Sequence, residues 1–204
     1  MTFRTKLGIS FLCLLLALAA SAEEFSGRVV RIVDGDTVVV LDQRRGEQKV
    51  RLAGIDAPER GQAFGTRAKE QLAGLVGGKP LNVRWHKEDR YGRLVGKLML
   101  DGQDVNLEMV RSGMAWWFRK YADEQTALDQ RLYEAAENAA RANRVGLWTD
   151  PEPIAPWDWR NRPEPPGGYA AKCPCGSGNI CIGKRGGRFC VRSSGTKKYF
   201  PRQK

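Results

Sequence analysis

The sequence predicts a small closed β-barrel with inserted helices, followed by a basic appendage that contains cysteines. β-Branched runs with alternating polarity, joined by short turns, indicate consecutive strands. Helical spacing of apolar residues appears after the third run and again near residue 140. Beyond residue 150 the composition changes to prolines and then to cysteines, which indicates a boundary.

Residues 1–22 are predicted to be a secretory signal peptide. Arg4 and Lys6 precede an apolar run, and Ala20-Ser21-Ala22 fits a small-residue cleavage site. The run is short for a membrane span, and no later segment is apolar for long enough to form one. We therefore expect a periplasmic or secreted protein without a stable membrane span after cleavage.

Five strands are expected in the body of the protein, residues 23–149. The first two are separated by an Asp-Gly turn, which is typical of hairpins. Their predicted bounds are residues 25–33, 37–42, 48–53, 81–86 and 94–100. Short turns between the first three favour a meander.

Three helices are predicted over residues 62–75, 105–111 and 124–143. The expected apolar face of the last comprises Leu128, Leu132, Ala135, Ala136 and Ala139. Helices inserted after the third strand and at the end of the body fit a barrel of the OB type. Such barrels often bind oligonucleotides on one face.

Residues 150–168 contain six prolines together with Trp157 and Trp159, so an extended linker is expected there. The tail, residues 169–204, is predicted to form two short strands around glycine turns. Its four cysteines are Cys173, Cys175, Cys181 and Cys190. Their spacing lacks the paired C-x2-C of zinc ribbons, which favours two disulfides in an exported chain.

Positive charge is concentrated at the C-terminal end. The chain has a net charge of +11, and residues 163–204 hold nine Lys or Arg against one acid, Glu164. This imbalance indicates a polyanionic partner, either nucleic acid or an anionic cell surface. A solvated basic tail without a specific ligand is the alternative.

Two aspartates are candidate metal ligands. Asp36 follows the tight Asp34-Gly35 turn, and Asp56 follows the third strand, so both carboxylates are expected at one end of the barrel. Hard oxygen ligands suit Ca²⁺ or Mg²⁺. The backbone carbonyl of Ala57 is a further candidate ligand, whereas Asp34 is expected to be only a turn former.

Three more residues are candidates for catalysis. Glu59 lies three positions after Asp56 and could position or deprotonate an attacking water. Arg51 and Arg93 could bind the non-bridging oxygens of a phosphate, because a guanidinium offers a planar, always-charged fork. Carboxylates and arginines together predict metal-assisted cleavage of a phosphodiester.

Residues 25–148 resemble the thermonuclease, or staphylococcal nuclease, family. The motifs that carry the resemblance are DGDT (34–37), VRLAGIDAPE (50–59), DRYGR (89–93), VNLEMVRSGMA (105–115) and GLW (146–148). The resemblance implies a five-stranded OB barrel with three helices. It also implies Ca²⁺-dependent hydrolysis of DNA and RNA that leaves 3′-phosphates.

The resemblance assigns roles residue by residue. It implies that Asp36 and Asp56, with the Ala57 carbonyl, bind calcium, and that Arg51, Glu59 and Arg93 are catalytic. Tyr91 matches a nucleotide-contacting aromatic residue of the family, and Tyr121 is a looser match to another.

Two alternatives remain open from the sequence. One is a non-catalytic nucleic-acid-binding module that has kept the groove of a nuclease fold. The other is an envelope-binding protein whose tail docks on anionic polymers. The presence of Arg51, Glu59 and Arg93 together favours the enzyme, and we expect a monomer.

Overall fold

The computed structural model describes residues 23–161, 173, 175–176, 179–183, 187–192 and 196–201. The predicted signal peptide lies outside these residues. In the part of the chain that is described, no helix is both long and apolar enough to cross a bilayer.

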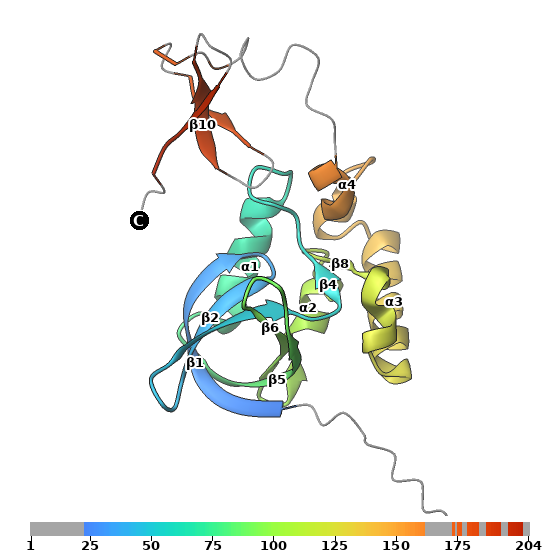
Figure 1. The fold of residues 1–204 in the computed structure, drawn as a ribbon. Coiled ribbons are helices and arrows are strands. Elements are labelled where there is room, and N and C mark those ends of the chain that lie inside the picture. Colours follow the sequence, from blue (N-terminus) through green and yellow to red (C-terminus); the bar gives the residue numbers. More distant parts are fainter. Residues whose placement is uncertain are drawn as a thin grey trace, which may run out of the picture.

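A six-stranded sheet forms the body of the protein and closes into a barrel (Figure 1). The strands follow the order β3-β2-β1-β5-β6-β7, with antiparallel neighbours throughout. The parallel pairing of β3 with β6 closes the barrel. Its strands are β1 (Glu23–Asp34), β2 (Thr37–Asp42), β3 (Glu47–Leu52), β5 (Pro80–Glu88), β6 (Leu94–Leu100) and the short β7 (Gln103–Asp104). β7 extends the sheet beyond the closing pair β3 and β6, so five strands form the closed barrel. The predicted five-stranded OB-type barrel is confirmed.

Local irregularities give the sheet the curvature that closure requires. The β1–β2 register shifts twice, between Val29 and Arg31 and between Ile32 and Asp34, and such irregularities increase strand bending. At the closing seam Gly96 pairs with Leu52. A Cβ on Gly96 would lie 2.4 Å from the Arg84 carbonyl oxygen, so only glycine fits there.

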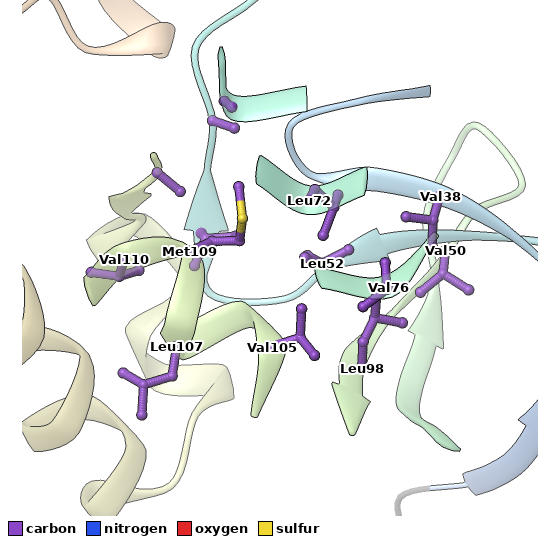
Figure 2. Packing of buried hydrophobic residues seen from close by; sticks show 14 of the residues in the cluster. Val38, Val50, Leu52, Leu72, Val76, Leu98, Val105, Leu107, Met109 and Val110 are labelled. Carbon is purple, nitrogen blue, oxygen red and sulfur yellow. The ribbon is translucent and has the colours of Figure 1, made fainter. Parts of the chain in front are cut away.

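The core fills the barrel and continues between the barrel and two helices (Figure 2). Valines of alternate strand positions point inward, and helices α1 (Gly65–Val76) and α2 (Val105–Arg111) cover the barrel with their apolar faces. Burial of each such side chain stabilises the fold by roughly 1.5–3 kcal/mol. Fully buried members include Val38, Val50, Leu72, Val76, Leu98 and Met109.

Helix boundaries follow capping chemistry. α1 begins after Phe64, whose left-handed φ of 65° ends the preceding loop, three residues later than predicted. α2 has the predicted bounds, and the side chain of Asp104 caps it by accepting from Leu107 N–H. α3 (Ala127–Ala142) begins after Thr126, which caps the N–H of Asp129. Two short 3₁₀ helices, η1 (Arg119–Glu124) and η2 (Gly146–Thr149), flank it.

The predicted apolar face of α3 is largely wrong. Leu128 and Leu132 are 58% and 40% exposed, and the buried side chains are Tyr133, Ala136, Glu137 and Ala140. Polar residues can enter this face because each finds a partner. The Tyr133 hydroxyl donates to Asp104, and Glu137 accepts from Trp117 N–H and Arg119.

The sequence predicts an extended linker after the body, but part of this segment is helical. Pro156–Asn161 forms helix α4, which begins with proline at a position where no N–H is needed. Residues 162–168 of the predicted linker lie outside the described residues.

In the tail, two disulfides join Cys173 to Cys181 and Cys175 to Cys190; their number is as predicted, whereas the sequence left their connectivity open. The described part of the tail has three short strands, whereas two were predicted. They form one sheet and are β9 (Cys181–Ile182), β10 (Arg188–Val191) and β11 (Lys197–Tyr199).

Candidate nuclease active site

The turn between β1 and β2 presents two aspartates. Asp34 accepts the N–H of Asp36 at 3.2 Å, which confirms it as a turn former. The Asp36 carboxylate is nearly buried; its Oδ1 accepts from the Thr37 hydroxyl and its Oδ2 from the Ala57 N–H at 3.0 Å. The second of these bonds joins the β1–β2 turn to the segment after β3.

Asp56 is held on a short strand beside the barrel. Gly54 turns the chain with a φ of 72°, and β4 (Ile55–Asp56) then pairs with β8 (Trp116–Trp117). The pairing fixes the main chain, and Asp56 is 1% exposed. Both predicted aspartate ligands are therefore rigidly placed.

Arg51 joins the two aspartates. From β3, its Nη1 lies 3.2 Å from Oδ2 of Asp36, and its Nη2 lies 3.1 Å from Oδ1 of Asp56. Nη1 also donates to the carbonyls of Leu52 and Ile55, both at 2.9 Å. The guanidinium is thus fixed by four groups, which a lysine could not contact together.

Burial and charge act in opposite directions on the carboxylates. Burial raises the pKa of Asp36, but the charge of Arg51 and the Ala57 N–H outweigh it and hold that pKa below its usual value. Burial raises the pKa of Asp56 despite Arg51. Burial and the charge of Asp36 raise the pKa of Asp34 to about 7. Asp34 is therefore electrostatically linked to the site, a role that its turn-forming sequence did not predict.

Glu59 lies next to the aspartates through a contact that the sequence did not predict. Its Oε1 accepts from Nη1 of Arg160 at 2.7 Å, and the same guanidinium contacts Asp56. The main-chain N–H of Glu59 donates to Gln62 Oε1 at 2.9 Å. The only sequence feature that could have indicated this contact is the position of Arg160 in PWDWR, directly after two tryptophans that could pack against the body.

Arg93 is not held in this cluster. Its Nε and Nη2 contact Asp89 Oδ2 at 2.8 and 2.7 Å, within the turn between β5 and β6. Its guanidinium also lies 5.5 Å from the centre of the Tyr91 ring. Arg51, Asp36, Asp56 and Glu59 come together as predicted, whereas Arg93 lies on a separate turn with contacts of its own.

The two tyrosines are accessible. Tyr91 is 63% exposed beside Arg90 and Arg93. Tyr121 is 40% exposed in η1, against the Phe118 ring and the ammonium of Lys87. Exposed rings beside cations can stack on bases near phosphates.

The donor set of the site suits a hard cation. Asp36 and Asp56 offer carboxylate oxygens, and the Asp36–Ala57 bond brings the main chain of Ala57 to the same place. In the described residues no group of three or more His, Cys, Asp or Glu side chains could hold a metal. Carboxylate oxygens, completed by water and by the predicted Ala57 carbonyl, are donors that suit Ca²⁺ or Mg²⁺ rather than zinc.

A closed five-stranded barrel with two buried aspartates bridged by an arginine is the arrangement expected of a nuclease of the staphylococcal type. Comparison with known proteins agrees. The family model "Staphylococcal nuclease homologue" matches residues 49–150. The chain belongs to this family.

Two bacterial relatives are similar over most of their length, and a plant relative over about a third of its length. An "Uncharacterized endonuclease" of Escherichia coli O157:H7 is 40% identical over 140 residues, which cover 68% of this chain and 87% of the relative. A "Micrococcal nuclease" of Shigella flexneri is 44% identical over 146 residues, covering 67% and 81%. The "Staphylococcal-like nuclease CAN1" of Arabidopsis thaliana is 42% identical over 113 residues, covering 55% of this chain and 33% of that protein.

Proposed function

We propose that this protein is a Ca²⁺-dependent nuclease that hydrolyses DNA and RNA and leaves 3′-phosphates. The observation that carries the proposal is the placement of Arg51 between Asp36 and Asp56, with Glu59 alongside, on a barrel of the nuclease family. The names of the relatives given above support nuclease activity.

In this proposal Asp36, Asp56 and the Ala57 carbonyl hold the cation. When bound, the ion supplies positive charge to the phosphate oxygens. Main-chain and arginine contacts hold both carboxylates in position, so cation binding requires an exchange of arginine contacts rather than a movement of the main chain.

Arg51 stabilises the charge that grows on the phosphate oxygens in the transition state. It is held by carbonyls as well as carboxylates, so it keeps its position when a cation competes for the carboxylates. Arg93 supplies a second guanidinium once it exchanges Asp89 for the phosphate. Glu59 orients the attacking water or accepts its proton, and Tyr91 and Tyr121 contact the flanking nucleotides.

Plasmid nicking and RNA degradation by residues 23–204 test the proposal. We expect cleavage with Ca²⁺, none with EDTA, and at least a 100-fold loss for Glu59→Gln, about the effect of removing one catalytic proton acceptor. Glu70→Gln, on the exposed side of α1, is the matched control. DNA binding without cleavage in every metal would instead assign a non-catalytic binding module.

We further propose that the chain is exported and that the basic tail binds polyanions. Four cysteines paired as two disulfides support an oxidising compartment. N-terminal sequencing of the protein from periplasm and medium tests cleavage after Ala22. Light scattering tests the expected monomer.

A further inference from the structure

Arg160 of α4 reaches the active site from beyond the segment that matches the family model. Its Nη2 lies 2.6 Å from Asp56 Oδ2, and its Nη1 lies 2.7 Å from Glu59 Oε1 and 3.3 Å from Asp56 Oδ1. One guanidinium thus spans a proposed metal ligand and the proposed catalytic carboxylate. Figure 1 shows α4 at the same end of the body as β4 and β8.

The position of Arg160 is fixed by packing. Trp157 stacks on Phe118 with ring centres 5.3 Å apart and meets Trp116 edge-on at 5.6 Å. Ala155 and Pro156 are buried at the start of the helix. Because this packing fixes the helix, Arg160 is held next to Asp56 and Glu59 and does not reach them merely as a flexible surface side chain.

A side-chain amide links α4 directly to Glu59. Gln62 is 7% exposed; its Oε1 accepts the Glu59 N–H, and its Nε2 donates to the Ile154 carbonyl at 2.6 Å. The Glu59 backbone and the start of α4 are consequently held by one side chain, while Arg160 joins the two segments from the other end.

Asp56 has no free oxygen in this arrangement. Oδ1 contacts Arg51 and Arg160, and Oδ2 contacts Arg160. A divalent cation that binds Asp56 must replace at least the Oδ2 contact, and it repels a guanidinium at that distance. The contact with Glu59 is made by the other guanidinium nitrogen, Nη1, whose shortest contact is with Glu59 Oε1. This contact therefore does not depend on Oδ2 of Asp56.

We propose that Arg160 is a positioning residue that competes with the metal ion: it neutralises Asp56 until a divalent cation replaces it there, and it holds Glu59 in place. The inference rests on the proposed function, because it assumes that a cation binds at Asp56. It predicts that loss of Arg160 tightens metal binding and impairs cleavage at the same time.

Calorimetric Ca²⁺ titration of the full mature chain tests the first half. Arg160→Gln removes a charge-assisted bond that the cation has to replace, so we expect Ca²⁺ to bind about tenfold more tightly, or by about 1.4 kcal/mol. Arg160→Lys keeps the charge and should bind Ca²⁺ within about threefold of the wild type. Arg131→Gln, an exposed change on α3, should alter neither binding nor cleavage.

Cleavage kinetics and arginine NMR test the second half. Since Glu59 loses its partner, kcat of Arg160→Gln should fall by about 10- to 100-fold with little change in KM. In the wild type, the Arg160 guanidinium signal should shift during the Ca²⁺ titration. Near-ultraviolet circular dichroism, which is sensitive to the packing of Trp157 against Trp116 and Phe118, verifies that α4 stays docked.

The outcomes separate the two proposals. Unchanged or weaker Ca²⁺ binding by Arg160→Gln, with α4 docked, overturns the competition. Unchanged kcat overturns the role in holding Glu59. If the wild type binds no Ca²⁺ and cleaves nothing, the proposed function fails together with the inference, and the wild-type titration alone reveals it.

Discussion

Nη1 of Arg51 lies 3.2 Å from Oδ2 of Asp36, and the two side chains are only 15% and 10% exposed. Asp36 lies in the turn directly before β2, and its neighbour Thr37 pairs with Arg51 in the β2–β3 register. The contact therefore follows directly from strand pairing, which makes it a structural element of the barrel as well as part of the site.

Removing Arg51 should destabilise the barrel. In Arg51→Gln the aspartates remain buried without their shared cation, and breaking such a pair costs roughly 3–5 kcal/mol. Urea unfolding followed by tryptophan fluorescence measures the loss. Asp36→Asn in the same chain should restore part of it, because one uncompensated charge is then gone. A double variant no more stable than Arg51→Gln would contradict this coupling.

Glu137 should support the site from a distance. Its buried carboxylate accepts from the Trp117 N–H at 3.1 Å and from Arg119 at 2.7 Å, so it fixes β8, the strand that pairs with Asp56. Glu137→Leu leaves the N–H without its acceptor and should lower the free energy of unfolding by about 3 kcal/mol. Hydrogen exchange at Trp117 should accelerate.

Glu134→Leu is the matched control for that variant. Glu134 lies on the exposed side of the same helix, so we expect changes within about 0.5 kcal/mol. Equal losses for the two leucine variants would show that helix composition, not the buried carboxylate, sets the effect.

The contact between Lys97 and Asp129 should make stability depend on pH. Burial raises the pKa of Asp129, but bonds from Lys97 and Thr126 outweigh it, so the folded-state pKa lies below its usual value. A carboxyl whose pKa is lowered by folding stabilises the protein above the unfolded pKa of about 3.9. This contribution is lost as the pH falls through the folded-state value.

Comparison of the wild type with Asp129→Asn tests this dependence. At pH 7 the variant should be the less stable of the two in urea, and the difference should shrink towards pH 2. A difference that is constant with pH would assign the effect to packing.

Deletion of residues 163–204 should weaken the binding of long polyanions and leave the chemistry intact. The deleted segment carries nine Lys or Arg and one acid, while the shortened chain keeps α4 and Arg160. We expect a higher KM on long DNA, a flatter salt dependence and unchanged kcat on short oligonucleotides. Identical kinetics on long and short substrates would contradict a substrate-binding tail.

Strands and aspartates could be predicted from the sequence because local patterns determine them. β-Branched alternation gave the five strands, and the Asp-Gly turn together with the segment after the third strand placed Asp36 and Asp56 at one end. Arg160 could not be predicted in the same way. Its proline- and tryptophan-rich surroundings are typical of linkers, and its partners lie 101 and 104 residues away.

The α3 face shows a second reason for failure. Hydrophobicity patterns place Leu128 inside and Glu137 outside, but the structure has the reverse. Burial of Glu137 depends on the Trp117 N–H and on Arg119, partners that only the tertiary fold supplies.

The distance along the chain between Asp56 and Arg160 also sets an order of events during synthesis. The β2–β3 hairpin, which carries Arg51 and directly follows Asp36, can form while the ribosome is still translating the helices, and barrel closure must await β6. Arg160 emerges only after the whole barrel has been made. Asp36, Arg51 and Asp56 are therefore all made long before Arg160, the second arginine of the cluster, can reach them.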